Sequence, residues 1–224
     1  MNIGKYKIKL VIFDMDGLMF DTEKLIFKTW KEACKKYKQK VSNKIFKETI
    51  GLNRKRTIEV YRKYYNDSLP FEKIIDEAVR LLESRIQSEG VPLKEGLLEL
   101  LEYNKKKQLK MALATSTKRD RAERMLNLSG TRKFFDLVVC GDEIINGKPD
   151  PEIFLETAKK LNCRPGNCIV LEDSKNGIIA AYRAGMLPVM VPDIIKPEKE
   201  IEAMIFKEFD NLKEVKSFFE YNFK

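Results

Sequence analysis

The chain has 224 residues, of which 43% are hydrophobic and 34% are charged, and its formal net charge is +9 at pH 7. This composition is typical of a soluble globular protein and excludes a disordered chain. It also excludes a chain built on membrane spans, because no window approaches the roughly 18 apolar residues that a span needs.

The first predicted element is a short buried strand, IKLVIF, which runs directly into the acidic stretch DMDG. A helix is predicted from residue 22 to about residue 38, with Asp21 as its N-cap. Two further segments keep the helical spacing of apolar residues, SNKIFKETIGLNRKRTIEVYRKYY and PFEKIIDEAVRLLESRIQSEG. We therefore predict that residues 21–88 form an all-helical insert.

After Gly90, predicted helices alternate with four predicted strands, LKMALATS, DLVVCG, CIVLEDS and PVMVP. Strands that alternate with helices indicate βαβ units and a parallel sheet. The sequence thus predicts an α/β core made of residues 1–20 and 89–224, interrupted after its first strand by the helical insert.

Polar side chains follow the apolar stretches LVIF, MALA, LVVCG and IVL, at the sheet edge where ligands of open parallel sheets bind. They are Asp14 and Asp16, then Thr115, Ser116, Thr117 and Lys118, then Asp142, Glu143 and Lys148, and finally Glu172, Asp173 and Ser174. Carboxylates gathered in this way need a cation, and hard oxygen ligands such as Asp14, Asp16 and Asp173 suit Mg²⁺. Hydroxyl groups and a lysine suit phosphate oxygens. The set favours phosphoryl transfer.

Four motifs carry a resemblance to a known family: DMDG at 14–17, ATST at 114–117, GKPDP at 147–151 and LEDSKNG at 171–177. In this order and spacing they resemble the haloacid dehalogenase-like (HAD) superfamily, whose core is Rossmann-like. The helical insert resembles its C1-type cap domain. GLMFDTE at 17–23 is similar to the sugar-phosphatase and β-phosphoglucomutase-like branch of subfamily IA.

The resemblance implies a role for each motif residue. Asp14 would attack phosphorus and form an aspartyl-phosphate, and Asp16 would act as the general acid and base. Mg²⁺ would be held by the Asp14 side chain, the Asp16 backbone carbonyl and Asp173, with Glu172 close behind. Thr115 and backbone N–H groups near Ser116 would hold the phosphoryl group, which Lys148 would neutralise.

Three further residues are candidates for substrate binding, each with an ordinary structural alternative. Lys118 also suits a surface position at a helix start, and Glu23 suits the first turn of a helix. Arg54 lies where this branch can place a phosphate-gripping cap arginine, although the neighbouring basic residues of RKR offer alternatives.

We predict a phosphatase acting on a small sugar phosphate or nucleotide. A β-phosphoglucomutase remains the alternative, but that branch carries a histidine where this sequence has Ile26, and the chain contains no histidine at all. A dehalogenase or phosphonatase is a third alternative, and Asp16 argues against the dehalogenase, because halide displacement by an aspartate needs neither this acid and base nor magnesium. A non-catalytic ligand-binding protein on the same fold is the alternative of another class.

The remaining expectations concern partners and location. The lysines alternate with glutamates, as in KEACKKYKQK, and no nucleic-acid motif is present, so we expect no nucleic-acid or membrane partner. The four cysteines form no CxxC pair and are expected to be free thiols in a reducing compartment. The basic N-terminal stretch lacks the apolar run of a signal peptide. We therefore expect a cytoplasmic monomer that binds a small phosphorylated metabolite.

Overall fold

Six parallel strands form the centre of the structure, a computed structural model that describes residues 2–4, 6–39, 42–49, 54–65, 70–193 and 199–222. Within these ranges, the side chains of residues 2, 23, 47 and 54–56 lie outside the description. The chain divides into two compact units, one comprising Met1–Phe20 and Pro92–Lys224, the other Asp21–Val91. The expected insert, residues 21–88, falls within the second unit. Each unit is described by itself.

The sheet of the first unit has the strand order β5-β4-β3-β6-β7-β8. The strands are β3 (Leu10–Phe13), β4 (Lys110–Thr115), β5 (Leu137–Cys140), β6 (Cys168–Glu172), β7 (Leu187–Met190) and β8 (Lys207–Glu208). All neighbouring pairs are parallel. The predicted α/β fold with a parallel sheet is thus confirmed. The short antiparallel pair of β1 (Asn2–Ile3) and β2 (Tyr6–Lys7), and strand β8, were not predicted.

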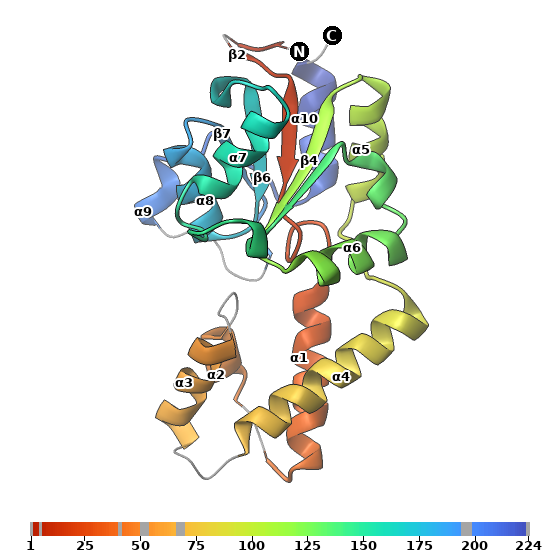
Figure 1. Ribbon diagram of the computed structural model, residues 1–224, viewed down its shortest axis with the longest axis vertical. Coiled ribbons are helices and arrows are strands. Elements are labelled where there is room, and N and C mark those ends of the chain that lie inside the picture. The colour runs from red at the N-terminus through yellow and green to blue at the C-terminus, as the bar shows by residue number, and fades with distance from the viewer. Residues whose placement is uncertain are drawn as a thin grey trace. The chain divides into compact units, whose positions relative to one another are not determined.

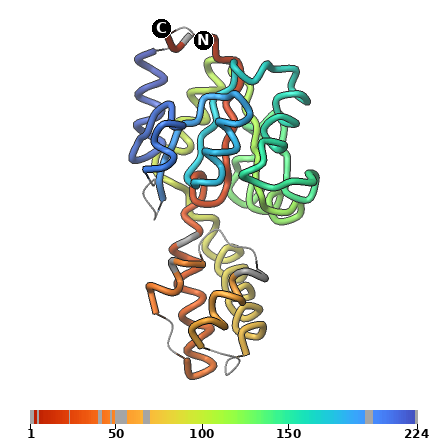
Figure 2. Tube along the Cα trace, turned by 90° about the vertical axis from the view of Figure 1, so that its left-hand side faces the viewer, coloured from red at the N-terminus to blue at the C-terminus, as the bar shows by residue number. Residues whose placement is uncertain are grey.

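Helices cover the sheet, as expected for a parallel sheet whose central strands are apolar and buried. They are α5 (Leu97–Lys106), α6 (Arg119–Leu128), α7 (Glu152–Lys160), α8 (Lys175–Arg183), α9 (Lys199–Glu202) and α10 (Leu212–Asn222). The 3₁₀ turns are η2 (Arg132–Phe134), η3 (Gly141–Glu143) and η4 (Pro165–Asn167). In Figures 1 and 2, α10 and α7 lie on opposite sides of the strands. Strands β3 and β6 are buried along their whole length, which fixes the positions of the residues that follow them.

One apolar cluster of the first unit joins the central strands to α7 and α8. Leu10, Ile12 and Val170 of the strands pack in one cluster with Phe154 and Ala181 of these helices. Each of these side chains is fully buried. Burying a large apolar side chain stabilises a fold by about 1.5–3 kcal/mol. The cluster therefore makes the sheet a rigid support for the loops at its edge.

The second unit is a small helical bundle of α1 (Thr22–Lys36), α2 (Asn43–Lys47), α3 (Arg54–Tyr65) and α4 (Phe71–Glu89). Helices α1 and α4 pack against each other and cross in the view of Figure 1. Trp30 and Tyr61 stack at its centre, with ring centroids 4.8 Å apart. Among the described helices of the chain, none is long and apolar enough to cross a membrane.

Two details of the helical unit bear on the sequence predictions. Asp21 occupies the predicted N-cap position of α1, but its side chain makes no capping hydrogen bond to the helix. Its carboxylate lies 2.8 Å from the ammonium of Lys24. Ile26, which stands where the mutase branch carries a histidine, packs against the apolar cluster of this unit.

Candidate active site

The two central strands of the sheet deliver acidic residues to one point. Phe13 of β3 lies opposite Leu171 of β6 in the parallel register, and the N–H of Asp14 continues the ladder by donating to the carbonyl of Leu171 at 3.0 Å. Asp14 is 7% exposed and Glu172 is 1% exposed. Because the strands are parallel neighbours, Asp14 and the Glu172–Asp173 pair emerge side by side at the carboxyl edge.

Lys148 joins these carboxylates from the loop before α7. Its Nζ lies 2.5 Å from Oδ1 of Asp14 and 2.6 Å from Oε1 of Glu172. It also donates to the carbonyl of Ala114 at 3.2 Å. The Lys148 side chain is only 6% exposed. A buried charge is tolerated only when it is paired and hydrogen-bonded, and this ammonium meets both conditions.

Burial shapes the protonation of the whole group. It raises the pKa of Asp14 to about 7, an effect that the ammonium of Lys148 opposes and the charge of Glu172 reinforces. Burial also disfavours the charged form of Lys148, but its two carboxylate partners more than offset this and raise the pKa of the ammonium. Burial, together with the charges of Glu172 and Asp14, raises the pKa of Asp173 well above its ordinary value. Lys148 alone therefore does not compensate three carboxylates, and their full ionisation is disfavoured unless a further cation is present.

These residues fit a divalent metal ion. Carboxylate oxygens of Asp14, Glu172 and Asp173 all lie within 4.8 Å of one another. Three ionised carboxylates beside one ammonium leave two negative charges uncompensated, which a divalent cation would balance. An all-oxygen ligand set is the kind that Mg²⁺ prefers.

A second acidic group on the same sheet already has ion-pair and hydrogen-bond partners. Cys140, Asp142 and Glu143 also lie within mutual reach. However, Glu143 forms an ion pair with Arg119, and Asp142 Oδ1 accepts from the Arg119 backbone N–H at 3.0 Å. These carboxylates therefore have partners that a metal would have to displace.

Glu172 is held in place by the loop that follows it. Its Oε2 accepts hydrogen bonds from Asp173 N, Ser174 N and Ser174 Oγ, each at 2.9 Å. Ser174 is the N-cap of α8, and its Oγ accepts from the N–H of Gly177 at 3.1 Å. A Cβ on Gly177 would overlap the Glu172 carboxylate, and one on Gly17, where φ is +85°, would overlap that of Asp173. Both glycines let the backbone approach the acidic group closely.

Asp16 has a different environment from Asp14. Its side chain is 27% exposed, and its Oδ2 accepts a hydrogen bond from Thr117 Oγ1 at 2.7 Å. Its Oδ1 lies 3.7 Å from Nη2 of Arg121, in the first turn of α6. Thr117 appeared in the sequence only as one of several hydroxyls after a strand, and Arg121 gave no signal there.

The other predicted site residues differ in burial, and two of them have side chains outside the described residues. Thr115 is buried at the end of β4, and its Oγ1 accepts from the N–H of Thr117 at 3.1 Å. Ser116 and Lys118 are exposed on the loop that follows β4. The side chains of Glu23 and Arg54, at the starts of α1 and α3, lie outside the described residues.

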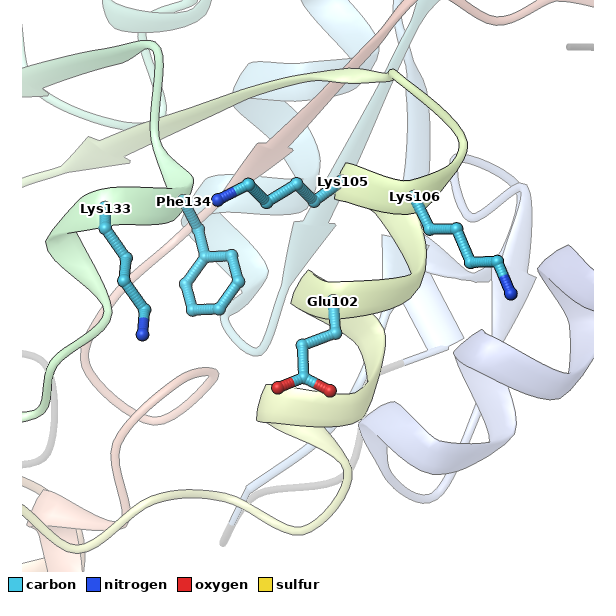
Figure 3. Close-up of a pocket in the computed structure, with 5 residues that line it drawn as sticks. All are labelled: Glu102, Lys105, Lys106, Lys133 and Phe134. Atoms are coloured by element: carbon cyan, nitrogen blue, oxygen red, sulfur yellow. The ribbon is translucent and has the colours of Figure 1, made fainter.

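A cavity of about 430 Å³ lies elsewhere on the first unit (Figure 3). It is formed by α5 and η2 and is lined by Glu102, Lys105, Lys106, Lys133 and Phe134. The lining includes none of the predicted site residues. Lys105 and Lys106 precede the amino-terminal end of β4, and Lys133 precedes that of β5. The acidic group instead lies at the carboxyl ends of the strands.

Comparison with known proteins gives consistent matches over most of the chain. A family model described as haloacid dehalogenase-like hydrolase matches residues 11–191. The phosphorylated carbohydrates phosphatase of Thermotoga maritima is 36% identical over 182 residues, which cover 80% of this chain and 82% of that protein. Hexitol phosphatase B of Escherichia coli K12 is 30% identical over 192 residues, covering 83% of this chain and 84% of that protein.

A solved structure extends the similarity to the whole fold. The crystal structure described as "putative beta-phosphoglucomutase from Thermotoga maritima" superposes with a TM-score of 0.82 at 30% sequence identity. The superposition covers 96% of this chain and 99% of that one. The match therefore includes both the sheet and the helical unit.

Proposed function

The chain belongs to the haloacid dehalogenase-like hydrolases, and we propose that it is a Mg²⁺-dependent phosphatase that hydrolyses a small phosphomonoester through an aspartyl-phosphate on Asp14. The family resemblance drawn from the four sequence motifs is confirmed by the family match over residues 11–191. Its relatives of similar length are named phosphatases, which makes the enzyme class a phosphoric monoester hydrolase.

One observation carries the proposal. The buried group of Asp14, Lys148, Glu172 and Asp173 gathers a nucleophile, a fixed cation and oxygen ligands for a metal within a few ångströms. Structural ion pairs are usually balanced in charge, whereas this group has a surplus of carboxylate. Such a surplus supports a site that is completed by a cation and an anionic substrate.

Each residue then has a defined task. The Asp14 carboxylate attacks the phosphorus atom, and Lys148 balances charge on Asp14 and on the transferring phosphoryl group. The Asp14 side chain, the Asp16 carbonyl and Asp173 would hold Mg²⁺, with Glu172 behind them. When bound, Mg²⁺ would neutralise phosphoryl oxygens and orient them toward the nucleophile.

Asp16 is assigned the proton transfers. It gives a proton to the oxygen of the leaving alcohol when the P–O bond breaks. Its carboxylate then takes a proton from the water that attacks the aspartyl-phosphate, and Asp14 leaves as a carboxylate. The partly exposed position of Asp16 beside the buried group suits a residue that meets both substrate and water.

Recognition of the phosphoryl group is assigned to Thr115 and to backbone N–H groups near Ser116. Lys118, Arg54 and Glu23 are the proposed contacts to the rest of the substrate. We propose that the helical unit is the cap domain and sets substrate choice, and that the substrate is a sugar phosphate or a nucleotide. The enzyme is expected to be a cytoplasmic monomer.

A phosphomutase is the second candidate, and the structural similarity to a protein described as a β-phosphoglucomutase favours it. Two sequence features oppose it. The chain has no histidine, and the corresponding position holds Ile26, whose side chain packs in the apolar cluster of the helical unit. A mutase would need another group to return the phosphate.

Phosphate release from a panel of sugar phosphates and nucleotides tests the proposal. The assay is run with Mg²⁺, with chelator and with Asp14→Asn, and Asp142→Asn serves as the matched control at the same sheet edge. Release that requires both Mg²⁺ and Asp14, with an 80 Da adduct on the Asp14 peptide after acid quench, is expected. Release that survives chelator or Asp14→Asn would refute the mechanism. Interconversion of glucose 1- and 6-phosphate faster than hydrolysis would favour the mutase.

A further inference from the structure

Three polar groups of Thr117, its N–H, its carbonyl and its hydroxyl, each form a hydrogen bond. Its backbone N–H donates to Thr115 Oγ1 at 3.1 Å, and its carbonyl accepts from the N–H of Gly141 at 3.0 Å. Its hydroxyl donates to Oδ2 of Asp16 at 2.7 Å. The backbone of Thr117 is thus attached both to the end of β4 and to η3, the turn after β5. The hydroxyl that reaches Asp16 therefore extends from a rigid support.

The packing around Gly141 strengthens this support. A Cβ on Gly141 would overlap the backbone carbonyl of Ser116, so the two backbone segments lie in close contact. A shift of the 115–117 segment would disturb the contact with Gly141 as well as the hydrogen bond to Thr117. The position of the Thr117 hydroxyl is consequently set by main-chain interactions and not by the flexibility of a long side chain.

Asp16, in contrast, lies on the turn just beyond β3. It forms a bridge with Phe20, and its side chain is partly exposed. An aspartate in such a turn has χ rotamers that point its carboxylate in different directions. A proton donor or acceptor must lie within hydrogen-bond reach of the reacting oxygen, and a misplacement of about 1 Å can cost about 100-fold in rate. An orienting contact is therefore important for the assigned role of Asp16.

The hydrogen bond also distinguishes the two oxygens of Asp16. Oδ2 is the oxygen that accepts the Thr117 proton. Oδ1 faces the guanidinium of Arg121 at 3.7 Å, which is longer than a hydrogen bond. Arg121 therefore adds a favourable charge near Oδ1.

We propose that Thr117 is a positioning residue that orients the Asp16 carboxyl group for its proton transfers. In the first step Asp16 releases its proton to the leaving alkoxide oxygen as the P–O bond breaks. In the second step Asp16 takes one proton from water as the hydroxide oxygen bonds to phosphorus. The Thr117 proton stays on Oγ1 throughout. This inference rests on the proposed phosphatase function.

Four variants, Arg121→Gln among them, test it in the intact protein with the best substrate from the phosphate-release panel. Thr117→Val removes the hydroxyl with little change in volume, and Thr117→Ser keeps it. Thr157→Val is the matched control, because the buried Thr157 hydroxyl donates to the carbonyl of Ile153 at 2.7 Å, outside the site.

Loss of a hydrogen bond to a charged group predicts that Thr117→Val lowers kcat by about 10–100-fold. KM should change by less than about 2-fold, since Thr117 acts through Asp16 and not on the substrate. Thr117→Ser should recover most of kcat, and Thr157→Val should leave it unchanged. Arg121→Gln should reduce kcat by no more than about 5-fold, because its ion pair is exposed and long.

The possible failures are distinguishable. Equal kcat for wild type and Thr117→Val would overturn the inference and leave the phosphatase function intact, as would a change in KM alone. No phosphate release by the wild type would overturn both. If Thr117→Val does not fold, Thr117→Ala replaces it, and its folding is checked by comparing its thermal midpoint with that of Thr157→Val. Thr117→Ala must then show the same loss of kcat, and Thr117→Ser must still recover it.

Discussion

Substituting Gly177 by alanine tests how closely α8 packs against the acidic group. Gly177 lies in the first turn of α8, where alanine would ordinarily favour the helix by about 1 kcal/mol. Here the new Cβ would overlap the carboxylate of Glu172. We therefore expect Gly177→Ala to destabilise the protein, against the helix propensity of the two residues.

The magnitude follows from the contacts that Glu172 would have to give up. Its carboxylate accepts three hydrogen bonds of 2.9 Å and pairs with Lys148 at 2.6 Å. Losing one hydrogen bond to a charged group costs about 1.5–3 kcal/mol. Overpacking adds about 1–3 kcal/mol. After the helical gain is subtracted, the free energy of unfolding should fall by about 3 kcal/mol, which corresponds to roughly 6–12 °C in Tm for a chain of this size.

Thermal and urea unfolding in the presence of chelator measure this change without a contribution from metal binding. Gly166→Ala is the control, since a Cβ there meets nothing within 4 Å and should change stability by no more than about 0.5 kcal/mol. Phosphate release by Gly177→Ala should fall together with stability, because Lys148 and Glu172 would no longer be fixed. A variant as stable as the wild type, or more stable, would refute the close packing of Gly177 on Glu172.

Three further predictions concern other charged and reactive groups. In chelator, Lys148→Met should lower the free energy of unfolding by about 3–5 kcal/mol, since it leaves two buried carboxylates without their cation; urea unfolding equal to the wild type would contradict this. Hydrogen bonds from Arg80 and Lys36 lower the pKa of Glu77 to about 2, below its ordinary value of 4.5. Its contribution to stability is therefore present above pH 4.5 and is lost as the pH falls toward 2, so Glu77→Gln should be less stable than the wild type at pH 7 but not at pH 2. Cys163 is partly exposed while the other three cysteines are buried, so native alkylation followed by mass spectrometry should modify Cys163 first, and equal labelling of all four would count against the burial.

Much of the fold could be predicted from the sequence because its strands are long enough to show a pattern. β3 and β6 are uninterrupted apolar runs that end in acidic residues, and the helical stretch between β3 and β4 has a clear period. β1, β2 and β8 have two residues each, which is too short for any periodicity. β1 and β2 pair with each other across a short turn, and β8 pairs with β7, so none of the three shows a pattern in the sequence.

The candidate site could be located from the sequence, but its pairings could not. The rule that ligands bind at the carboxyl ends of parallel strands brought Asp14, Lys148 and Glu172 to one edge. Nothing in the sequence shows that Lys148 lies between the two carboxylates, or that Asp142, which also follows a strand, accepts from the N–H of Arg119 instead. Burial and the direction of side chains decide these partners.

The hydroxyl run after β4 illustrates this limit most clearly. Three consecutive residues with the same functional group, Thr115, Ser116 and Thr117, lie in three different environments: one is buried, one is exposed and one donates to Asp16. Along an extended strand, side chains alternate and their direction can be predicted. β4 ends at Thr115, and beyond it the direction of the chain is set by the hydrogen bond from Gly141 to the Thr117 carbonyl. The residue that reaches Asp16 is therefore determined by a contact with the neighbouring strand's loop, which no local pattern encodes.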